Sequence, residues 1–297
     1  MPGGTIAAMR AAFLAVISVF ALFAQPARFD LVITGAKLAD GSGNPAFLAD
    51  IGIRGDTIAA IGFLADAPAA ARIDARGLIA APGFIDIHSH GRRGIFNVPT
   101  AENYLREGVT TIIEGPDGGS PLPIKPFLDR VTATGVSINF ATFVGQGTIR
   151  SEVMGLVDRK ATPEELDKMK ALAAQAMKDG AFGMSTGLFY VPGNFTPTEE
   201  VIELAKVVGG MGGIHISHMR EEAGKILDSV RETIRIGEEG GLPTQVTHHK
   251  IIGKPNWGKS VETLKLVEEA RARGVDVTID QYPYTCLLYT SPSPQDS

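Results

Sequence analysis

Gly83-Phe-Ile-Asp-Ile-His-Ser-His90 is a short apolar stretch that ends in two histidines. Its length and apolar residues are typical of a β-strand, in which residues i and i+2 point to the same face. The imidazoles of His88 and His90 should therefore project together, an arrangement that suits one divalent metal ion. Asp86 lies on the same side of the strand and could accept the other imidazole N–H of His88.

Polar side chains recur at the ends of later predicted strands. The six histidines all lie at or near the ends of three such strands: His88, His90, His215, His218, His248 and His249. His218 and His248 are the better candidate ligands, because His215 precedes its strand end and His249 points away from the side of His248. Asp117 follows another strand and is a further candidate, although Pro-Asp-Gly is also ordinary turn chemistry.

Strands and helices alternate from Pro82 onward. The predicted strands cover residues 83–88, 110–114, 138–145, 182–186, 213–218, 244–248 and 275–280. Helices are expected at 162–180, opened by a Thr162–Glu165 capping box, and at 198–208, 221–239 and 260–273. This pattern predicts an α/β fold with a (β/α)8 TIM-like barrel at residues 82–285, lacking its eighth strand, rather than a shorter doubly wound sheet. In such a barrel the C-terminal strand ends meet on one face, where the active site lies.

The region before the barrel has a different pattern. Residues 28–81 contain short β-type runs at 30–34, 51–54 and 57–61, separated by turn residues, which predicts a small β-rich domain. Within it, only the stretch Ala67–Ala71 has the composition of a helix.

The N-terminus and the composition restrict the functional class. Residues 1–27 resemble a signal peptide, since an apolar run from Ala11 to Ala24 follows Arg10 and is too short for a stable membrane span. The protein is therefore expected to be exported (periplasmic or secreted). The alternative is a buried or frayed N-terminal helix in a cytoplasmic protein. The net charge of −5 without a basic run argues against a nucleic-acid partner, and the single Cys286 excludes an intramolecular disulfide.

Charged and aromatic residues follow the candidate ligands closely. Arg220 and Lys250 each lie two residues after a candidate histidine, so each could hold a substrate carboxylate or be a solvated loop charge. Tyr282 and Tyr284 could donate hydrogen bonds to a developing oxyanion or simply pack. Together these residues suit metal-assisted amide hydrolysis, although no residue stands out as the carboxylate base.

The ordered motifs resemble one family. They are Ala81-Pro-Gly-Phe-Ile-Asp-Ile-His-Ser-His90, Gly108-Val-Thr-Thr111, Gly183-Met-Ser-Thr-Gly-Leu-Phe-Tyr190, Ser217-His-Met-Arg220, Thr247-His-His-Lys250 and Asp280-Gln-Tyr-Pro-Tyr284. The chain is thereby similar to the N-acyl-D-amino-acid deacylases (D-aminoacylases), a branch of the metal-dependent amidohydrolases. The resemblance implies hydrolysis of N-acyl-D-amino acids with one or two Zn²⁺ ions, and a β-sandwich at residues 28–81.

The resemblance also implies residue roles. The expected metal ligands are His88, His90, Asp117, His218 and His248, and the expected substrate-binding residues are Arg220, Lys250, Tyr282, Tyr284 and Tyr190. Asp117 stands where D-aminoacylases often have a cysteine ligand, and Gln146 stands where a histidine is common.

The C-terminal residues depart from the family. The family carries its catalytic aspartate at the end of strand eight, and residues 286–297 resemble a non-native read-through tail instead. The chain is therefore expected to be a C-terminally truncated fragment that is inactive, whereas the native gene product should be active.

Two alternatives remain open at this point. One is another amidohydrolase that acts on cyclic amides or isoaspartyl dipeptides through the same metal site. The other is a non-catalytic exported protein that uses the site only to bind metal.

Overall fold

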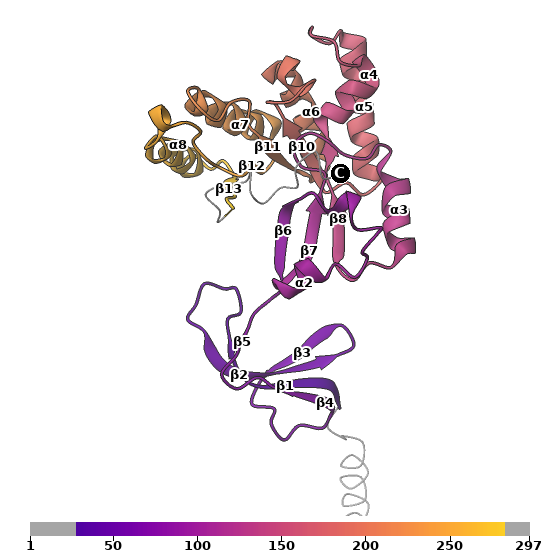
Figure 1. Cartoon of the computed structure of the whole chain (residues 1–297), viewed down its shortest axis with the longest axis vertical. Helices are drawn as coiled ribbons and strands as arrows, with labels where there is room; N and C mark the ends of the chain where they lie inside the picture. Colours follow the sequence, from indigo (N-terminus) through magenta and orange to yellow (C-terminus); the bar gives the residue numbers. More distant parts are fainter. Residues whose placement is uncertain (1–27, 283–297) are drawn as a thin grey trace, which may run out of the picture. The chain divides into compact units, whose positions relative to one another are not determined.

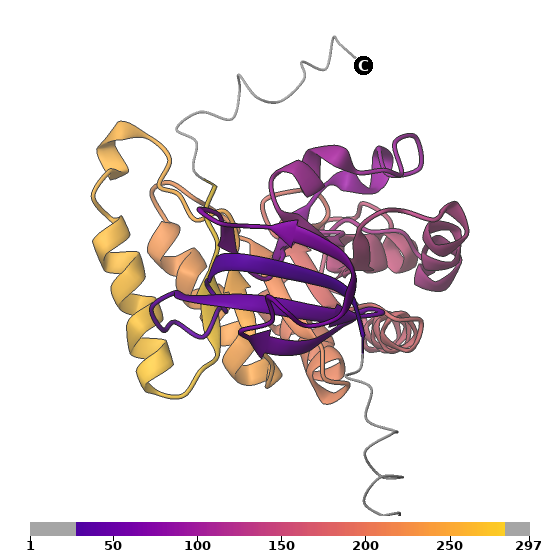
Figure 2. The ribbon, with the colours of Figure 1, turned by 90° about the horizontal axis from the view of Figure 1, so that it is seen from below.

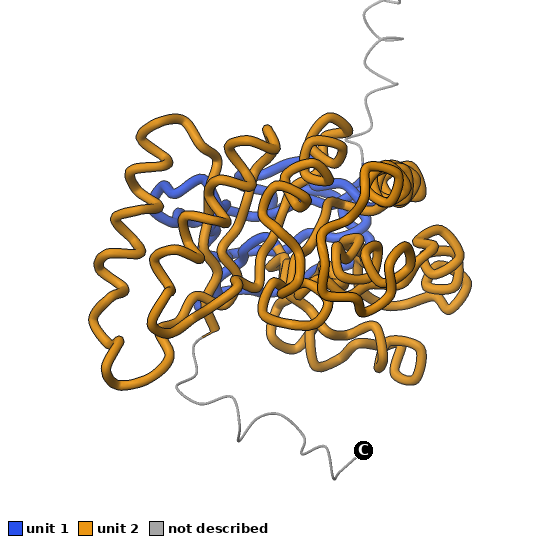
Figure 3. The backbone as a smooth tube through the Cα atoms, turned by 90° about the horizontal axis from the view of Figure 1, so that it is seen from above, with its two compact units in different colours: residues 1–82 blue, residues 83–297 orange. Residues whose placement is uncertain are grey.

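The computed structural model describes residues 28–282. Contacts divide the chain into two compact units, residues 1–82 and residues 83–297 (Figure 3). The expected signal peptide at 1–27, the expected tail at 286–297 and Tyr284 lie outside the described residues.

The first unit is a five-stranded sheet, as its β-type runs predicted. Its strands are β1 (Phe29–Leu38), β2 (Phe47–Arg54), β3 (Thr57–Gly62), β4 (Ala69–Asp74) and β5 (Ile79–Ala80). Strands β3, β2, β1 and β4 lie side by side in that order (Figure 2), and β5 pairs with β1. The β2–β3 hairpin turns at Gly55, whose φ of 57° is left-handed and suits glycine.

The alanine-rich stretch in this unit contributes to strand β4, although its composition is typical of a helix. Ala69 and Ala71 pair in parallel with Phe29 and Leu31 of β1. Helix propensity is a weak local preference, and the hydrogen bonds offered by the open edge of β1 override it.

The second unit carries all seven predicted parallel strands. They are β6 (Phe84–Ser89), β7 (Val109–Glu114), β8 and β9 (Asn139–Thr142 and Val144–Gly145), β10 (Gly183–Gly187), β11 (Ile214–His218), β12 (Thr244–Val246) and β13 (Val277–Ile279). Strands β8 and β9 form one predicted strand that is interrupted at Phe143. Within the described range, β6–β7–β8 and β9–β10–β11–β12–β13 pair in sequence order, and every one of these pairings is parallel.

Helices alternate with these strands (Figure 1). They are α2 (Glu102–Arg106), α3 (Ile124–Thr134), α4 (Gln146–Met154), α5 (Pro163–Lys178), α6 (Thr198–Gly210), α7 (Ile226–Gly240) and α8 (Ser260–Ala272), with short 3₁₀ turns at η1 (Gly91–Arg93), η2 (Gly193–Phe195) and η3 (Lys254–Asn256). The order strand, helix, parallel strand is that of a (β/α)8 barrel, seven strands of which lie in the described residues.

Helix α5 shows how local sequence sets an element. The Thr162 hydroxyl accepts the Glu165 N–H, and the Glu165 carboxylate accepts the Thr162 N–H, so the predicted capping box is confirmed. Met169, Ala173 and Ala176 then recur every three or four residues and are buried in the largest apolar core.

Helix α7 begins at Ile226, five residues later than expected. Residues before it form a turn, in which the Glu221 carboxylate accepts the backbone N–H groups of Ala223 and Lys225. Because this side chain satisfies the backbone donors, the segment that follows β11 stays out of the helix. That segment carries residues of the site.

Candidate metal centre

The predicted ligands converge at the C-terminal ends of the parallel strands. His88 and His90 come from the end of β6, Asp117 follows β7, His218 ends β11, and His248 follows β12. The Asp117 carboxylate lies between two groups of ligand atoms, His88 with His90 and His218 with His248. We call the first the exposed pair and the second the buried pair.

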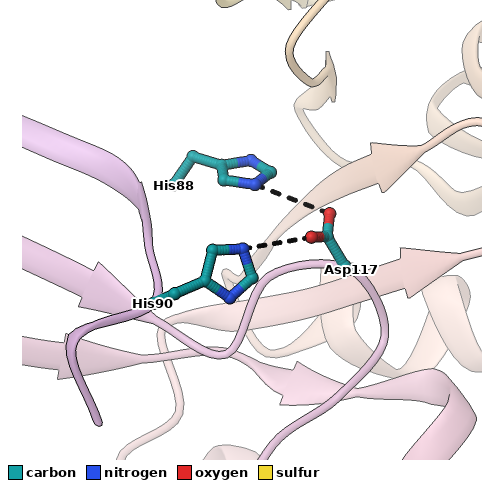
Figure 4. A group of neighbouring side chains, drawn as sticks. All are labelled: His88, His90 and Asp117. Atoms are coloured by element: carbon teal, nitrogen blue, oxygen red, sulfur yellow. Dashed lines mark ion pairs between the residues drawn. The ribbon is translucent and has the colours of Figure 1, made fainter. Parts of the chain in front are cut away.

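The exposed pair lies on one side of Asp117 (Figure 4). His88 Nε2 is 3.5 Å from Asp117 Oδ1, and His90 Nε2 is 3.2 Å from Oδ2. The two imidazole centroids are 5.4 Å apart, which confirms that the i, i+2 spacing brings both rings together. The His90 side chain is 63% exposed, so solvent reaches this pair.

The buried pair approaches the same carboxylate from later strands. Asp117 Oδ1 is 3.5 Å from His218 Nδ1 and 3.6 Å from His248 Nε2. The His218 and His248 side chains are only 9% and 13% exposed. The two rings also share a hydrogen bond of 2.7 Å between His248 Nε2 and His218 Nδ1.

This donor set fits a metal ion. Two ligand atoms that each lie about 2.1 Å from a tetrahedral ion are separated by about 3.4 Å, which matches the 3.2–3.6 Å between Asp117 and the four imidazoles. His88 Nδ1 and Asp117 Oδ1 are buried without a hydrogen-bond partner. Nitrogen and oxygen donors of this kind suit Zn²⁺, and the 2.7 Å contact between His218 and His248 would have to lengthen around an ion.

The histidines keep Asp117 ionised. Burial would raise the pKa of this carboxyl group, but the nearby imidazoles of His218, His248 and the exposed pair hold it far below its usual range. Burial also opposes a charge on His248, yet Asp117 and Glu222 together raise its pKa to about 9. A carboxylate that gathers four imidazoles attracts positive charge strongly, which is what a cation site requires.

Glu222 supports the buried pair and was missed by the sequence analysis. It lies in the segment after β11 and is almost fully buried. Its Oε1 is 3.1 Å from His248 Nδ1, and its Oε2 is 2.6 Å from Lys250 Nζ. A carboxylate beside Nδ1 favours a proton on that nitrogen, and the Nε2 lone pair of His248 is then free for a metal. The signal was its position four residues after His218, which has meaning only once the neighbouring loop is placed beside it.

Asp280 is a second missed residue, at the end of β13. Its Oδ2 lies 4.0 Å from His88 Nδ1, and the carboxylate accepts hydrogen bonds from Gln245 Nε2 and from the backbone N–H of His248. Tyr282, a predicted site residue, lines a cavity of about 350 Å³ together with His88, His248 and Asp280. The structure thus brings Tyr282 to the metal-facing residues.

The expected role of Asp86 is corrected. Its carboxylate accepts the backbone N–H of His88 at 2.9 Å, and not the imidazole N–H. Because the acceptor lies two residues before the donor, the bond closes a local turn at the strand end.

Tyr190 lies beside the buried pair, at the turn that follows β10. Its ring centroid is 4.6 Å from that of His218, and the side chain remains partly exposed. With Asp117 it lines a second cavity of about 320 Å³, whose other walls are mostly glycines.

Arg220 is held by partners on helix α7 and in the segment before α6. Its guanidinium donates to Glu232 on α7 and to the backbone carbonyls of Asn194 and Thr196. These contacts use most of its donors, so in this position the group holds the segment before α6.

The remaining candidate residues, His215, His249 and Gln146, are hydrogen-bonded to threonines. His215 is fully buried between the hydroxyls of Thr186 and Thr244, and burial lowers its pKa to about 3. His249 is hydrogen-bonded to Thr263 of α8. Gln146, where the family often has a histidine, is fully buried and donates to Thr196.

The sequence of this chain is similar to those of known proteins. A search of family models found no match. A D-aminoacylase from Alcaligenes xylosoxydans xylosoxydans is 42% identical over 279 residues, which span 86% of this chain and 57% of that protein. The chain belongs to the N-acyl-D-amino-acid deacylase family of amidohydrolases.

Solved structures agree with this membership. A D-aminoacylase with a binuclear metal centre is 38% identical, with a TM-score of 0.81 over 86% of this chain and 59% of that chain. The N-acyl-D-glutamate deacylase from Bordetella bronchiseptica, solved with zinc and a phosphonate mimic of the tetrahedral intermediate, is 35% identical, with a TM-score of 0.83 over 87% of this chain and 59% of that chain. The chain therefore spans under two thirds of the length of these relatives.

Proposed function

We propose that this protein hydrolyses the amide bond of N-acyl-D-amino acids with zinc, releasing a carboxylate and a D-amino acid. The observation that carries the proposal is the convergence of four imidazoles on the Asp117 carboxylate. The relatives supply the substrate class, since they are deacylases of N-acyl-D-amino acids. A binuclear centre in a relative supports assigning both the exposed and the buried pair to metal.

The described residues would bind the metal through five ligands and support them through one further carboxylate. His88, His90, Asp117, His218 and His248 would hold the metal, which when bound supplies an acidified water and a polarised carbonyl. Asp117 contributes the negative charge that offsets the cation, and Glu222 keeps His248 in the tautomer that binds through Nε2.

Lys250 is the proposed anchor for the substrate carboxylate. Its ammonium group lies 3.0 Å from the His248 ring and is held by Glu222. A lysine acts as a point charge for an anionic group, and this position lies directly beside the buried pair. Tyr282 and Tyr190 flank the centre on the two cavities and would orient the amide, whereas Tyr284 is assigned to the substrate only from the sequence motif.

The test is stereospecific hydrolysis by the full-length gene product. Zinc content is measured together with turnover of N-acetyl-D-methionine and of its L isomer. Bound zinc with turnover of the D isomer alone is the expected result. Bound zinc with turnover of dihydroorotate or a β-aspartyl dipeptide instead would move the enzyme to another amidohydrolase class. Bound zinc without turnover of any of them would leave a metal-binding protein.

We also propose that the protein is exported. The support is the apolar run from Ala11 to Ala24 after Arg10. None of the described helices is long and apolar enough to cross a membrane. Cell fractionation with N-terminal sequencing tests the proposal, and a protein that keeps Met1 in the cytoplasm would contradict it.

A further inference from the structure

Glu114 is a buried carboxylate that metal binding does not use. It is the last residue of β7, and its side chain has no exposed surface. Oε2 accepts the backbone N–H of Arg92 at 3.1 Å, and Oε1 lies 3.6 Å from Arg92 Nε. Among the described residues Oε1 has no hydrogen-bond partner, so this ion pair is its compensation. A buried charge lowers the stability of the fold unless it is paired, so the Glu114 carboxylate requires Arg92.

The guanidinium of Arg92 also contacts the loop that follows β7. Its Nη1 donates to the carbonyl of Gly119 at 2.6 Å. Arg92 lies two residues after His90, and Gly119 lies two residues after Asp117. The pair Glu114–Arg92 therefore connects the loop that carries one metal-facing residue to the loop that carries another.

The loop around Asp117 depends on such contacts. Gly115, Asp117 and Gly118 all have left-handed backbone conformations, with φ values of 79°, 58° and 76°. An aspartate in this region is tolerated but not preferred, so the surroundings have to hold it there. His90 is mostly exposed, and the only ion pair of its imidazole in the described part of the chain is with Asp117.

We propose that Glu114 and Arg92 form a brace that positions His90 and Asp117 and so sets the metal affinity of the exposed pair. Both are positioning residues, because neither faces the reacting atoms. For its metal readout the inference rests on the proposed function. The buried pair is held separately by Glu222, so loss of the brace should affect the two pairs unequally.

The first test compares zinc affinities in the full-length protein. The exposed site is identified as the one that loses zinc in His90→Ala. Glu114→Gln keeps the shape of the side chain but removes its charge, and should weaken this site about 10- to 100-fold. Arg92→Lys keeps the charge without the fork and should weaken it less. The buried site, which loses zinc in His218→Ala, should change less than threefold in both variants.

A matched control comes from a second buried Arg–Glu ion pair. Arg150 and Glu200 join α4 to α6, and they also bind backbone groups of Arg159 and Ala161. Glu200→Gln should lower the melting temperature without changing the ratio of the two zinc affinities. If Glu114→Gln weakens both zinc sites in parallel with its melting temperature, or leaves both unchanged, the brace is wrong.

A second readout needs no metal. Amide hydrogen exchange of the chelated protein should rise in residues 90–94 and 115–120 in Glu114→Gln, but not in residues 219–225. Glu200→Gln should raise exchange at residues 157–161 instead. If wild-type protein binds no zinc, the proposed metal centre fails, and this exchange pattern still decides the brace: unchanged exchange in both loops would overturn it.

Discussion

The two pairs of histidines that share Asp117 are held in different ways. His218 and His248 are almost buried, and Glu222 and Lys250 fix the His248 ring from behind. His90 is 63% exposed and lies in a loop that the Glu114–Arg92 brace ties to the loop of Asp117. Ligands that are fixed before metal arrives lose less freedom on binding. The difference therefore predicts a tighter site at the buried pair and a weaker one at the exposed pair.

The largest expected effect comes from removing what both pairs share. Asp117→Asn keeps the size of the side chain but removes the charge that all four imidazoles contact. Zinc should be lost from both sites, and turnover should fall by about 1000-fold or more, since metal stabilisation of the transition state amounts to several kcal/mol. Metal analysis and kcat/KM check this, with Asp129→Asn on the surface of α3 as the control. A variant that keeps one tight zinc would remove Asp117 from the buried site.

Substitution of one histidine in each pair tests directly whether the two pairs differ in zinc affinity. His218→Ala should weaken zinc binding to the protein more than His90→Ala, by about tenfold, because only His218 belongs to the preorganised pair. Chelator competition on the two variants measures this ratio. Equal losses would mean that burial and the contacts of Glu222 make no difference to affinity.

Removal of the support behind His248 should have a smaller effect. Glu222→Gln should weaken the buried site by about 10- to 100-fold, as expected when the carboxylate partner of a metal-binding histidine is lost. The neighbouring Glu221→Gln serves as the control, since Glu221 only accepts backbone N–H groups of its own turn. Equal effects of the two changes on zinc affinity would assign Glu222 a purely structural role.

A last prediction concerns stability and a histidine that belongs to neither pair. His215 lies on the same strand as His218 but is buried without an acid, which lowers its pKa to about 3. The unfolded chain binds this proton at about pH 6.5, so the free energy of unfolding should fall as the pH drops from there towards 3. His215 alone should lower the free energy of unfolding by about 1.4 kcal/mol for each pH unit lost in this range, and should have no effect above about pH 6.5. Urea unfolding of metal-free protein checks the slope, and His215→Gln should flatten it.

Much of the fold and part of the centre could be predicted from local sequence. The seven strands and the Thr162 cap follow from residue patterns within a few positions, and parallel topology then brings the strand-end histidines together. Glu114, Glu222 and Asp280 could not be found in this way, because their partners lie on other strands and loops. Arg220 shows the same limit, since the Glu232 that it contacts lies on the following helix.

The most direct test of the shared centre is the position of zinc itself. Crystals of the full-length protein grown with zinc are measured at the zinc absorption edge, which locates the ion by anomalous scattering. We expect a strong peak within about 2.0–2.3 Å of Asp117, His218 and His248 and a weaker one beside His88 and His90. A peak that contacts none of these residues, or no peak at saturating zinc, would contradict the account.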